Sequence, residues 1–126
     1  MPLTAPTVAV LDDEPKMRKA LCRLMSTHEF VVHDYETASD LFAALPDHPA
    51  DCLVLDVHMP GESGLDVLWK LTTKNIHLPT VVITGHDEPG TEERARAFGA
   101  SAYLTKPVDE TALIRAITAA IATHHP

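Results

Sequence analysis

Short apolar runs alternate along the chain with stretches in which apolar residues recur every three or four positions. The runs cover residues 7–11, 30–32, 53–55, 80–83 and 102–104, and a stretch of helical spacing follows each of them. Apolar runs of this length predict buried strands, whereas spacing of three and four predicts amphipathic helices. We therefore expect five strand–helix repeats, the sequence pattern of a parallel sheet covered by helices.

Residues at the ends of the periodic stretches indicate where the helices begin and end. The expected markers are Pro15 in the first turn of the first helix, Thr37 with Asp40 for the second, Ser63 with Asp66 for the third, Gly99 after the fourth and Asp109 before the fifth. The two pairs have the spacing of a capping box, and a glycine after a helix favours a left-handed cap. The apolar face of the first helix is expected to consist of Met17, Ala20, Leu21, Leu24 and Met25.

The length and composition of the chain suit one compact domain. The chain has 126 residues, of which 45% are hydrophobic, and a chain of this length buries about two-thirds of its unfolded surface on folding. No stretch of linker-like composition separates the repeats. We expect a single domain over residues 1–126, with a core of about residues 7–122.

The charge and the cysteines narrow the class of protein. The formal net charge is −8, which disfavours direct nucleic-acid binding because such a surface needs a basic patch. Cys22 and Cys52 lack metal-binding spacing and indicate a reducing compartment. No apolar stretch approaches the ~20 residues of a membrane span, and residues 1–6 lack the pattern of a secretory signal. These features predict a cytoplasmic protein.

Side chains that could form a ligand site lie at or just after the ends of four of the five apolar runs. Asp12 and Asp13 follow the first, Asp56 the third, Thr84 the fourth, and Lys106 comes two residues after the fifth. Burying an unpaired carboxylate is costly, so Asp56 at the end of its run needs partners. The carboxyl ends of parallel strands share one edge of the sheet, where open α/β sheets bind ligands. We expect three carboxylates, a hydroxyl and an ammonium group to converge there.

In this order, these residues resemble the receiver domain of bacterial two-component response regulators. The matching segments are Asp12-Asp13, the stretch from Asp56 through Pro60 to Gly64, Thr84-Gly85 and Lys106-Pro107. The motif Ile83-Thr84-Gly85-His86 is similar to the one in receivers of the nitrogen-fixation regulator type. The resemblance covers nearly the whole chain. It implies an α/β fold, (βα)5 and doubly wound, whose five parallel strands have the flavodoxin-like order 2-1-3-4-5.

The resemblance implies that Asp56 is a phosphoacceptor that attacks a phosphoryl group as a carboxylate nucleophile. It also implies that Asp13, Asp56 and the backbone carbonyl of His58 bind Mg²⁺, with Asp12 acting through a bound water. Magnesium prefers oxygen ligands, which these residues supply. Without the resemblance, Asp12, Asp13 and Glu14 would read as a negative first turn that complements the helix dipole.

Lys106 and Thr84 complete the catalytic set that the resemblance implies. Lys106 would pair with a phosphoryl oxygen, aimed by a cis bond to Pro107, and the Thr84 hydroxyl would bond another oxygen. Gly85 leaves room for the phosphoryl group. Such a domain is a signalling phosphoacceptor, because the only reactions it catalyses are its own phosphorylation and dephosphorylation.

Thr84 and Tyr103 match the switch residues of the family. By resemblance, phosphorylation draws Thr84 toward the phosphoryl group and Tyr103 turns inward, which changes the surface of the fourth helix, fifth strand and fifth helix. An ordinary strand aromatic would look the same in sequence. His58 and His86 either line the rim of the site and tune the phosphoryl lifetime or are ordinary exposed histidines.

The partners implied are a sensor histidine kinase or phosphotransfer protein as phosphoryl donor, with acetyl phosphate as a small-molecule substitute. Lys16, Lys19 and Arg23 either form part of the kinase-docking surface or are a solvated basic face. A homodimer of the phosphorylated form is possible. The output is either control of transcription through a further domain or the action of a stand-alone receiver in a phosphorelay.

Three other functions compete with this interpretation. A pseudo-receiver would act as a phosphorylation-independent interaction module, but its usual mark is loss of the acidic pair, the acceptor or the lysine. A phosphatase or phosphomutase with an aspartyl-phosphate intermediate would show a second aspartate where the chain has His58. A flavin-binding protein would need a phosphate-binding loop where the chain has Asp12 and Asp13, which would repel phosphate.

Overall fold

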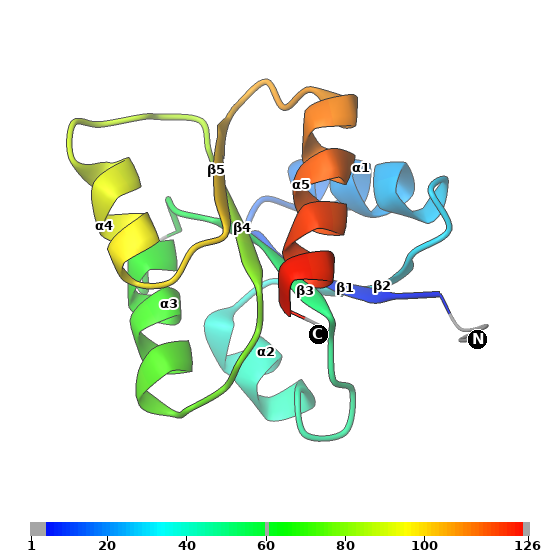
Figure 1. Ribbon diagram of the computed structural model, residues 1–126, viewed down its shortest axis with the longest axis horizontal. Helices are drawn as coiled ribbons and strands as arrows, with labels where there is room; N and C mark the ends of the chain where they lie inside the picture. Colours follow the sequence, from blue (N-terminus) through cyan, green and yellow to red (C-terminus); the bar gives the residue numbers. More distant parts are fainter. Residues whose placement is uncertain (1–4, 60, 125–126) are drawn as a thin grey trace.

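The computed structural model describes residues 5–59 and 61–124. Its elements are β1 (Thr7–Leu11), α1 (Pro15–Ser26), β2 (Val31–Tyr35), α2 (Ala38–Ala44), β3 (Cys52–Asp56), α3 (Gly64–Thr73), β4 (Thr80–Thr84), α4 (Thr91–Ala97), β5 (Ala102–Thr105) and α5 (Glu110–His124) (Figure 1). The predicted alternation of strand and helix is confirmed. Pro60, which the resemblance includes, lies outside the described residues.

The five strands form one parallel sheet with the order β2-β1-β3-β4-β5, which confirms the expected fold class. In this order β1 lies between β2 and β3, so the chain reverses its direction of winding next to the β1–β3 pair. Ligands bind at such a reversal, outside the carboxyl ends of the strands. The register pairs Leu11 with Leu55 and Thr84 with Thr105. The predicted site residues therefore follow strand ends that lie at one edge.

Helices cover both faces of the sheet (Figure 1). On one face α2, α3 and α4 pack on strand residues such as Leu11, Leu55 and Val82. On the other face α1 and α5 pack on Val10, Val54 and their neighbours. Because the central strands are buried on both faces, they read as continuous apolar runs in the sequence.

The expected bounds of β2 and one residue of the α1 stripe were wrong. We expect a strand over residues 30–32 from the sequence, but β2 runs from Val31 to Tyr35. As an edge strand it has solvent on one side, and Val31 is 45% exposed. Polar residues therefore continue the strand where the apolar run stops. Ala20 is exposed, because the buried side of α1 is centred on Leu21 and Met25.

The predicted helix caps form, but only one of the two predicted capping boxes has both of its hydrogen bonds. Ser63 and Asp66 make both hydrogen bonds of a capping box, whereas Thr37 only accepts a hydrogen bond from the backbone N–H of its partner three residues later. Asp109 accepts a hydrogen bond from the backbone N–H of Ala112. Gly99 has φ +104° after α4 and forms the expected left-handed turn.

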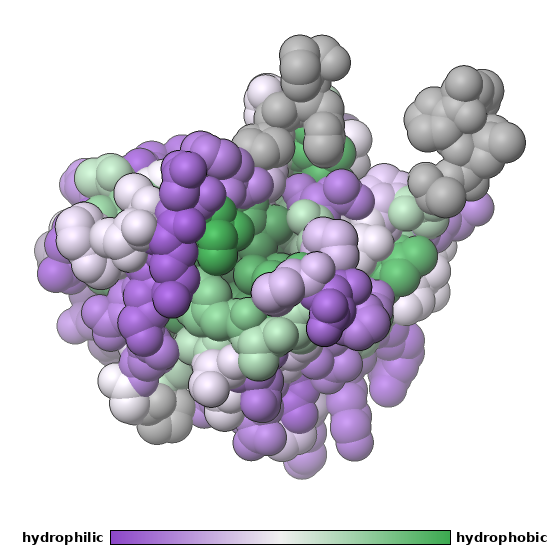
Figure 2. All heavy atoms as spheres, turned by 90° about the horizontal axis from the view of Figure 1, so that it is seen from below, coloured by the Kyte–Doolittle hydropathy of each residue, from purple (hydrophilic) through white to green (hydrophobic). Residues whose placement is uncertain are grey.

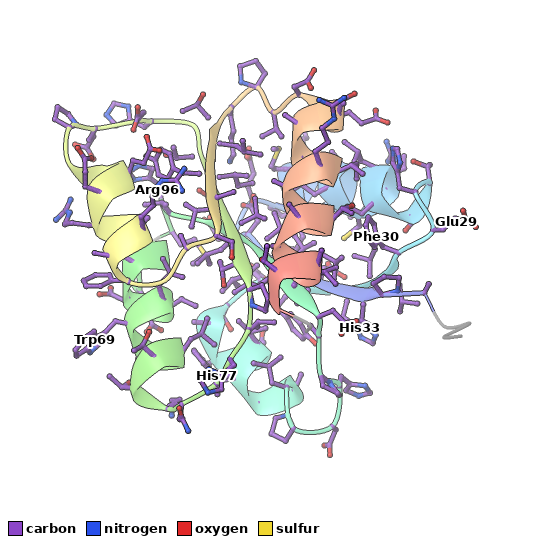
Figure 3. All side chains as sticks on the ribbon, viewed as in Figure 1. Glu29, Phe30, His33, Trp69, His77 and Arg96 are labelled. Atoms are coloured by element: carbon purple, nitrogen blue, oxygen red, sulfur yellow. The ribbon has the colours of Figure 1, made fainter. Side chains whose placement is uncertain are left out.

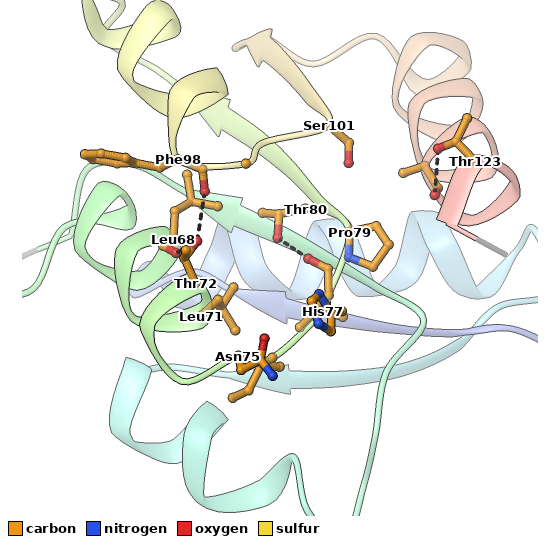
Figure 4. Close-up of a pocket in the computed structure, with 14 residues that line it drawn as sticks. Leu68, Leu71, Thr72, Asn75, His77, Pro79, Thr80, Phe98, Ser101 and Thr123 are labelled. Carbon is orange, nitrogen blue, oxygen red and sulfur yellow. Dashed lines mark hydrogen bonds between the residues drawn. The ribbon is translucent and has the colours of Figure 1, made fainter.

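The opposite edge of the sheet carries a hollow that apolar and polar side chains line together. Hydrophobic residues gather between hydrophilic ones on the face seen in Figure 2. The pocket in Figure 4 is lined by side chains that include Leu68, Leu71 and Pro79, and it contains none of the predicted site residues.

Trp69 points away from α3 into solvent and is 55% exposed, with the centre of its ring 5.9 Å from the centre of the Phe98 ring (Figure 3). Trp69 therefore does not belong to the buried side of α3.

Gly64 begins α3 directly against the end of β3. A Cβ atom at this position would lie 2.6 Å from the carbonyl oxygen of Asp56 and 2.7 Å from Cα of Val57. Because both neighbours are backbone atoms, Gly64→Ala has to displace the segment that carries Asp56. We expect a loss of about 1–3 kcal/mol in the free energy of unfolding, as for other overpacked sites, measured by urea denaturation.

The control for this substitution is Gly61→Ala. Gly61 has φ +81°, and among the described residues other than its chain neighbours no atom lies within 4 Å of the place that a Cβ would take. This variant therefore isolates the cost of the backbone conformation. A Gly64→Ala protein as stable as the wild type, or more stable than Gly61→Ala, would contradict the expected clash.

Candidate functional site

The structure brings the three predicted aspartates together at the carboxyl edge of the sheet. Asp12, Asp13 and Asp56 each place one carboxylate oxygen within 4.8 Å of the others. Asp12 is 0% exposed and Asp56 is 5% exposed, whereas Asp13 is half-buried. A cluster of carboxylates that is largely withdrawn from water needs cations to balance its charge.

Lys106 supplies one such cation. Its Nζ atom lies 3.4 Å from Oδ2 of Asp56 and 3.9 Å from Oδ2 of Asp12. The Lys106–Pro107 peptide bond is cis, as the resemblance implies. A Cβ at Gly85 would lie 3.3 Å from Cδ of the lysine, so the glycine leaves space for the lysine stem. The ammonium group therefore faces the carboxylates of both Asp12 and Asp56.

Asp12 has one satisfied and one unsatisfied carboxylate oxygen. Oδ1 accepts a hydrogen bond from the backbone N–H of Glu14 at 3.0 Å, whereas Oδ2 is buried without a hydrogen-bond partner among the described residues. Burial raises the pKa of Asp12 to about 6, the Glu14 N–H and Lys106 oppose this rise, and the charges of Asp56 and Asp13 add to it. A buried oxygen without a partner beside two more carboxylates fits a hard divalent cation such as Mg²⁺.

The raised pKa of Asp12 predicts how the stability of the metal-free protein depends on pH. The carboxyl group titrates near 3.8 in an unfolded chain and at about 6 in the folded protein. Its contribution to stability is therefore full below the unfolded pKa and is lost as the pH rises through the folded pKa. Asp12→Asn removes this loss of stability, because the asparagine amide does not ionise. We expect the variant to be about 1–3 kcal/mol more stable than the wild type above about pH 7.

This difference is measured by thermal or urea unfolding in EDTA from about pH 4 to about pH 8. It should shrink toward the acid end, where the wild-type carboxyl group is also neutral. A difference that stays constant with pH, or an asparagine variant that is less stable at neutral pH, would show that Asp12 is not a strained carboxylate.

Thr84 is buried at the end of β4, and its hydroxyl is engaged with the next loop. Thr84 Oγ1 donates to the carbonyl of His86 at 3.1 Å and accepts from the backbone N–H of His86 at the same distance. The carbonyl of His86 also accepts from Nε2 of His58 at 2.8 Å. The centres of the two histidine rings lie 5.8 Å apart, and the rings are arranged edge to face. His58 thus connects the loop after β3 with the loop after β4.

The sequence gives only the spacing of these two histidines and does not indicate that they touch. The backbone of His58, whose carbonyl is the predicted metal ligand, makes a further contact. Its N–H donates a hydrogen bond to Oδ1 of Asp56 at 3.1 Å. This hydrogen bond fixes one oxygen of Asp56, while Lys106 faces the other.

Tyr103 is buried in this structure. The residue is 9% exposed and belongs to the core under α2, α3 and α4. Its hydroxyl donates to Oδ1 of Asp87 at 2.7 Å, and burial together with this hydrogen bond and the negative charge of Asp87 raises the pKa of the phenol. Asp87 is a residue that the sequence reasoning missed, because nothing in the polar segment after β4 distinguishes it.

The fold and the edge of carboxylates, lysine and threonine define a receiver domain. The chain belongs to the response regulator receiver domain family, which it matches over residues 8–118. Receiver domains of transcriptional regulators are signalling proteins rather than conventional enzymes, and they bind Mg²⁺ at an acidic pocket such as the one formed here by the aspartates.

Among its relatives, the chain is 35% identical over 115 residues to the transcriptional regulatory protein FixJ of Rhizobium meliloti, covering 91% of this chain and 56% of that protein. It is 36% identical over 117 residues to nodulation protein W of Bradyrhizobium diazoefficiens, covering 93% and 52%. The chain thus spans about half the length of these curated relatives. The likeness to nitrogen-fixation regulators expected from residues 83–86 is confirmed.

Solved structures agree with this assignment. The crystal structure of FixJ-N superposes with a TM-score of 0.88 at 33% identity, covering 95% of this chain and 96% of that one. Full-length FixJ from B. japonicum gives a TM-score of 0.90 at 31% identity, covering 98% of this chain and 61% of that one. Within the described part of the chain, none of the helices has the length and apolar character needed to cross a bilayer.

Proposed function

We propose that this domain accepts a phosphoryl group on Asp56 in a Mg²⁺-dependent reaction and thereby switches a surface that controls an output. The observation that carries the proposal is the pair of contacts around Asp56. Its Oδ1 accepts from the backbone N–H of His58, and its Oδ2 lies 3.4 Å from Nζ of Lys106. The carboxylate is thereby held in one orientation beside a cation, and both groups line the same pocket.

In the proposed reaction an Asp56 carboxylate oxygen forms a bond to phosphorus, and the bond from phosphorus to the donor's imidazole or acetate breaks. Lys106 balances the charge on the phosphoryl oxygens, which is the main task of a protein in phosphoryl transfer. Asp12, Asp13, Asp56 and the backbone carbonyl of His58 would hold the metal. When bound, Mg²⁺ would neutralise further negative charge there.

The switch would begin at Thr84. To donate a hydrogen bond to a phosphoryl oxygen, the Thr84 hydroxyl has to leave the carbonyl of His86. That carbonyl would keep its hydrogen bond from His58, so the loop would not lose all of its contacts. Movement of this loop would displace Asp87 and so change the hydrogen bond that Asp87 accepts from Tyr103. This route connects Asp56 with the surface of α4, β5 and α5.

The phosphoryl donor would be a sensor histidine kinase or a phosphotransfer protein in the cytoplasm. Receiver domains of FixJ-type regulators interact with histidine kinases, and the exposed Lys16, Lys19 and Arg23 on α1 are available for such a contact. The single domain over residues 1–126 would control transcription, as the relatives' names suggest, with dimerisation of the phosphorylated form as one route. A phosphorylation-independent pseudo-receiver is not favoured, because the acidic pair, the acceptor and the lysine are all present.

The proposal is tested by incubating the protein with acetyl phosphate, with Mg²⁺ or with EDTA, and measuring its intact mass. We expect the wild type to gain the mass of one phosphoryl group with Mg²⁺ and none with EDTA. No gain under either condition would overturn the proposal, and an equal gain in EDTA would overturn the role of the metal.

A further inference from the structure

Arg18 connects α1 with the loop that carries the acidic pair. Its side chain is 14% exposed, and its guanidinium group makes two contacts in different directions. Nη1 donates to the backbone carbonyl of Asp12 at 2.8 Å, and Nε donates to Oδ2 of Asp34 on β2 at 3.0 Å. The guanidinium thus joins the end of β1 to the neighbouring edge strand.

The backbone of Asp12 is held on both sides of its Cα atom. Its N–H donates to the carbonyl of Tyr35 at the end of β2, and its carbonyl accepts from Arg18. Both contacts lead to β2, since Arg18 is itself anchored on Asp34. The side chain, which has an unpartnered oxygen, can therefore face Asp56 and Lys106 without being free to move away from them.

We propose that Arg18 is a positioning residue for the cation site. It fixes the peptide between Asp12 and Asp13 and so sets the distance of their carboxylates from Asp56. Arginine suits this task because its planar fork can hold two acceptors at once and never loses its charge. The inference rests on the proposed Mg²⁺-dependent function and adds to it a residue outside the acidic cluster.

The sign of the expected effect separates positioning from simple electrostatics. Removing the positive charge of Arg18 leaves the site more negative, which by itself would strengthen the binding of a cation. Loss of positioning acts in the opposite direction, and removal of partners that orient metal ligands typically weakens binding about 10–100-fold. We therefore expect Arg18→Ala to weaken Mg²⁺ binding by about tenfold.

Two further variants sharpen this expectation. Arg18→Lys keeps the charge, but its single ammonium group does not reproduce the two-acceptor fork, so Mg²⁺ affinity should recover only in part. Asp34→Ala leaves the contact with the Asp12 carbonyl in place and removes only the anchor on β2, so its effect should be smaller than that of Arg18→Ala.

The test is a titration of the unphosphorylated protein with Mg²⁺. Calorimetry or the NMR chemical shifts of backbone amides measure the binding. The matched control is Arg96→Ala, because Arg96 forms an exposed ion pair with Glu92 at 3.1 Å on α4, away from α1 (Figure 3). Urea denaturation without Mg²⁺ checks that each variant folds.

Weaker Mg²⁺ binding by Arg18→Ala than by both wild type and Arg96→Ala would support the inference, whereas equal or tighter binding would overturn it. If Arg18→Ala does not fold, Arg18→Lys decides in the same way. A wild-type protein that binds no Mg²⁺ would overturn the proposed function, and the inference with it. Wild-type binding that Arg18→Ala retains overturns the inference alone.

Discussion

Asp56→Asn is expected to abolish the uptake of a phosphoryl group from acetyl phosphate. An asparagine amide has the shape of the carboxylate but is not a nucleophile, so no acyl phosphate can form. The fold should persist, because the amide oxygen can still accept the hydrogen bond from the backbone N–H of His58. Intact mass after incubation with acetyl phosphate and Mg²⁺ measures the effect.

The matched control is Asp47→Asn, which changes the same chemical group at an exposed position after α2. This variant should gain the same mass as the wild type. A phosphoryl gain in Asp56→Asn equal to that of the Asp47→Asn control would mean that another residue accepts the phosphoryl group.

Lys106→Ala is expected to slow phosphorylation by about 10²–10³-fold, the usual cost of removing one group that stabilises charge in a transition state. The ammonium group lies 3.4 Å from Asp56 Oδ2 and the lysine side chain is only 21% exposed, so water replaces it poorly. Its loss also leaves the Asp12 and Asp56 carboxylates without their common protein cation. The measurement is the initial rate of mass gain with acetyl phosphate at saturating Mg²⁺.

Lys74→Ala serves as the control, because Lys74 is an exposed lysine whose ammonium group lies 5.7 Å from the centre of the Phe42 ring. We expect the rate of this variant to match that of the wild type. If Lys106→Ala were phosphorylated as fast as Lys74→Ala, the ammonium group would have no part in the reaction.

The sheet and the convergence of the site residues followed from the sequence, because both depend on simple regularities. Central strands of a parallel sheet are buried on both faces and give apolar runs, and their carboxyl ends meet at one edge. Asp12, Asp56 and Lys106 could therefore be placed together from their positions after such runs. The edge strand β2 was harder to predict, since an edge strand is less buried than a central one and here includes the polar residues His33 and Asp34.

The contacts that connect the site with its surroundings could not be predicted in the same way. The hydrogen bonds from His58 to the His86 carbonyl and from Tyr103 to Asp87 depend on the path of the loop after β4. Arg18 lies on a helix where spacing alone gives no reason to expect contact with β2. Such contacts are set by tertiary structure, and the types of the two residues do not specify them.

The most direct test of the central claim is to locate the modified residue. Reduction of an aspartyl phosphate with borohydride converts that aspartate to homoserine and releases phosphate, and peptide mass spectrometry then identifies its position. After incubation with acetyl phosphate and Mg²⁺, we expect homoserine at position 56 and no homoserine when EDTA replaces the metal. Homoserine at position 12 or 13, or at no position, would contradict the assignment of Asp56 as the phosphoacceptor.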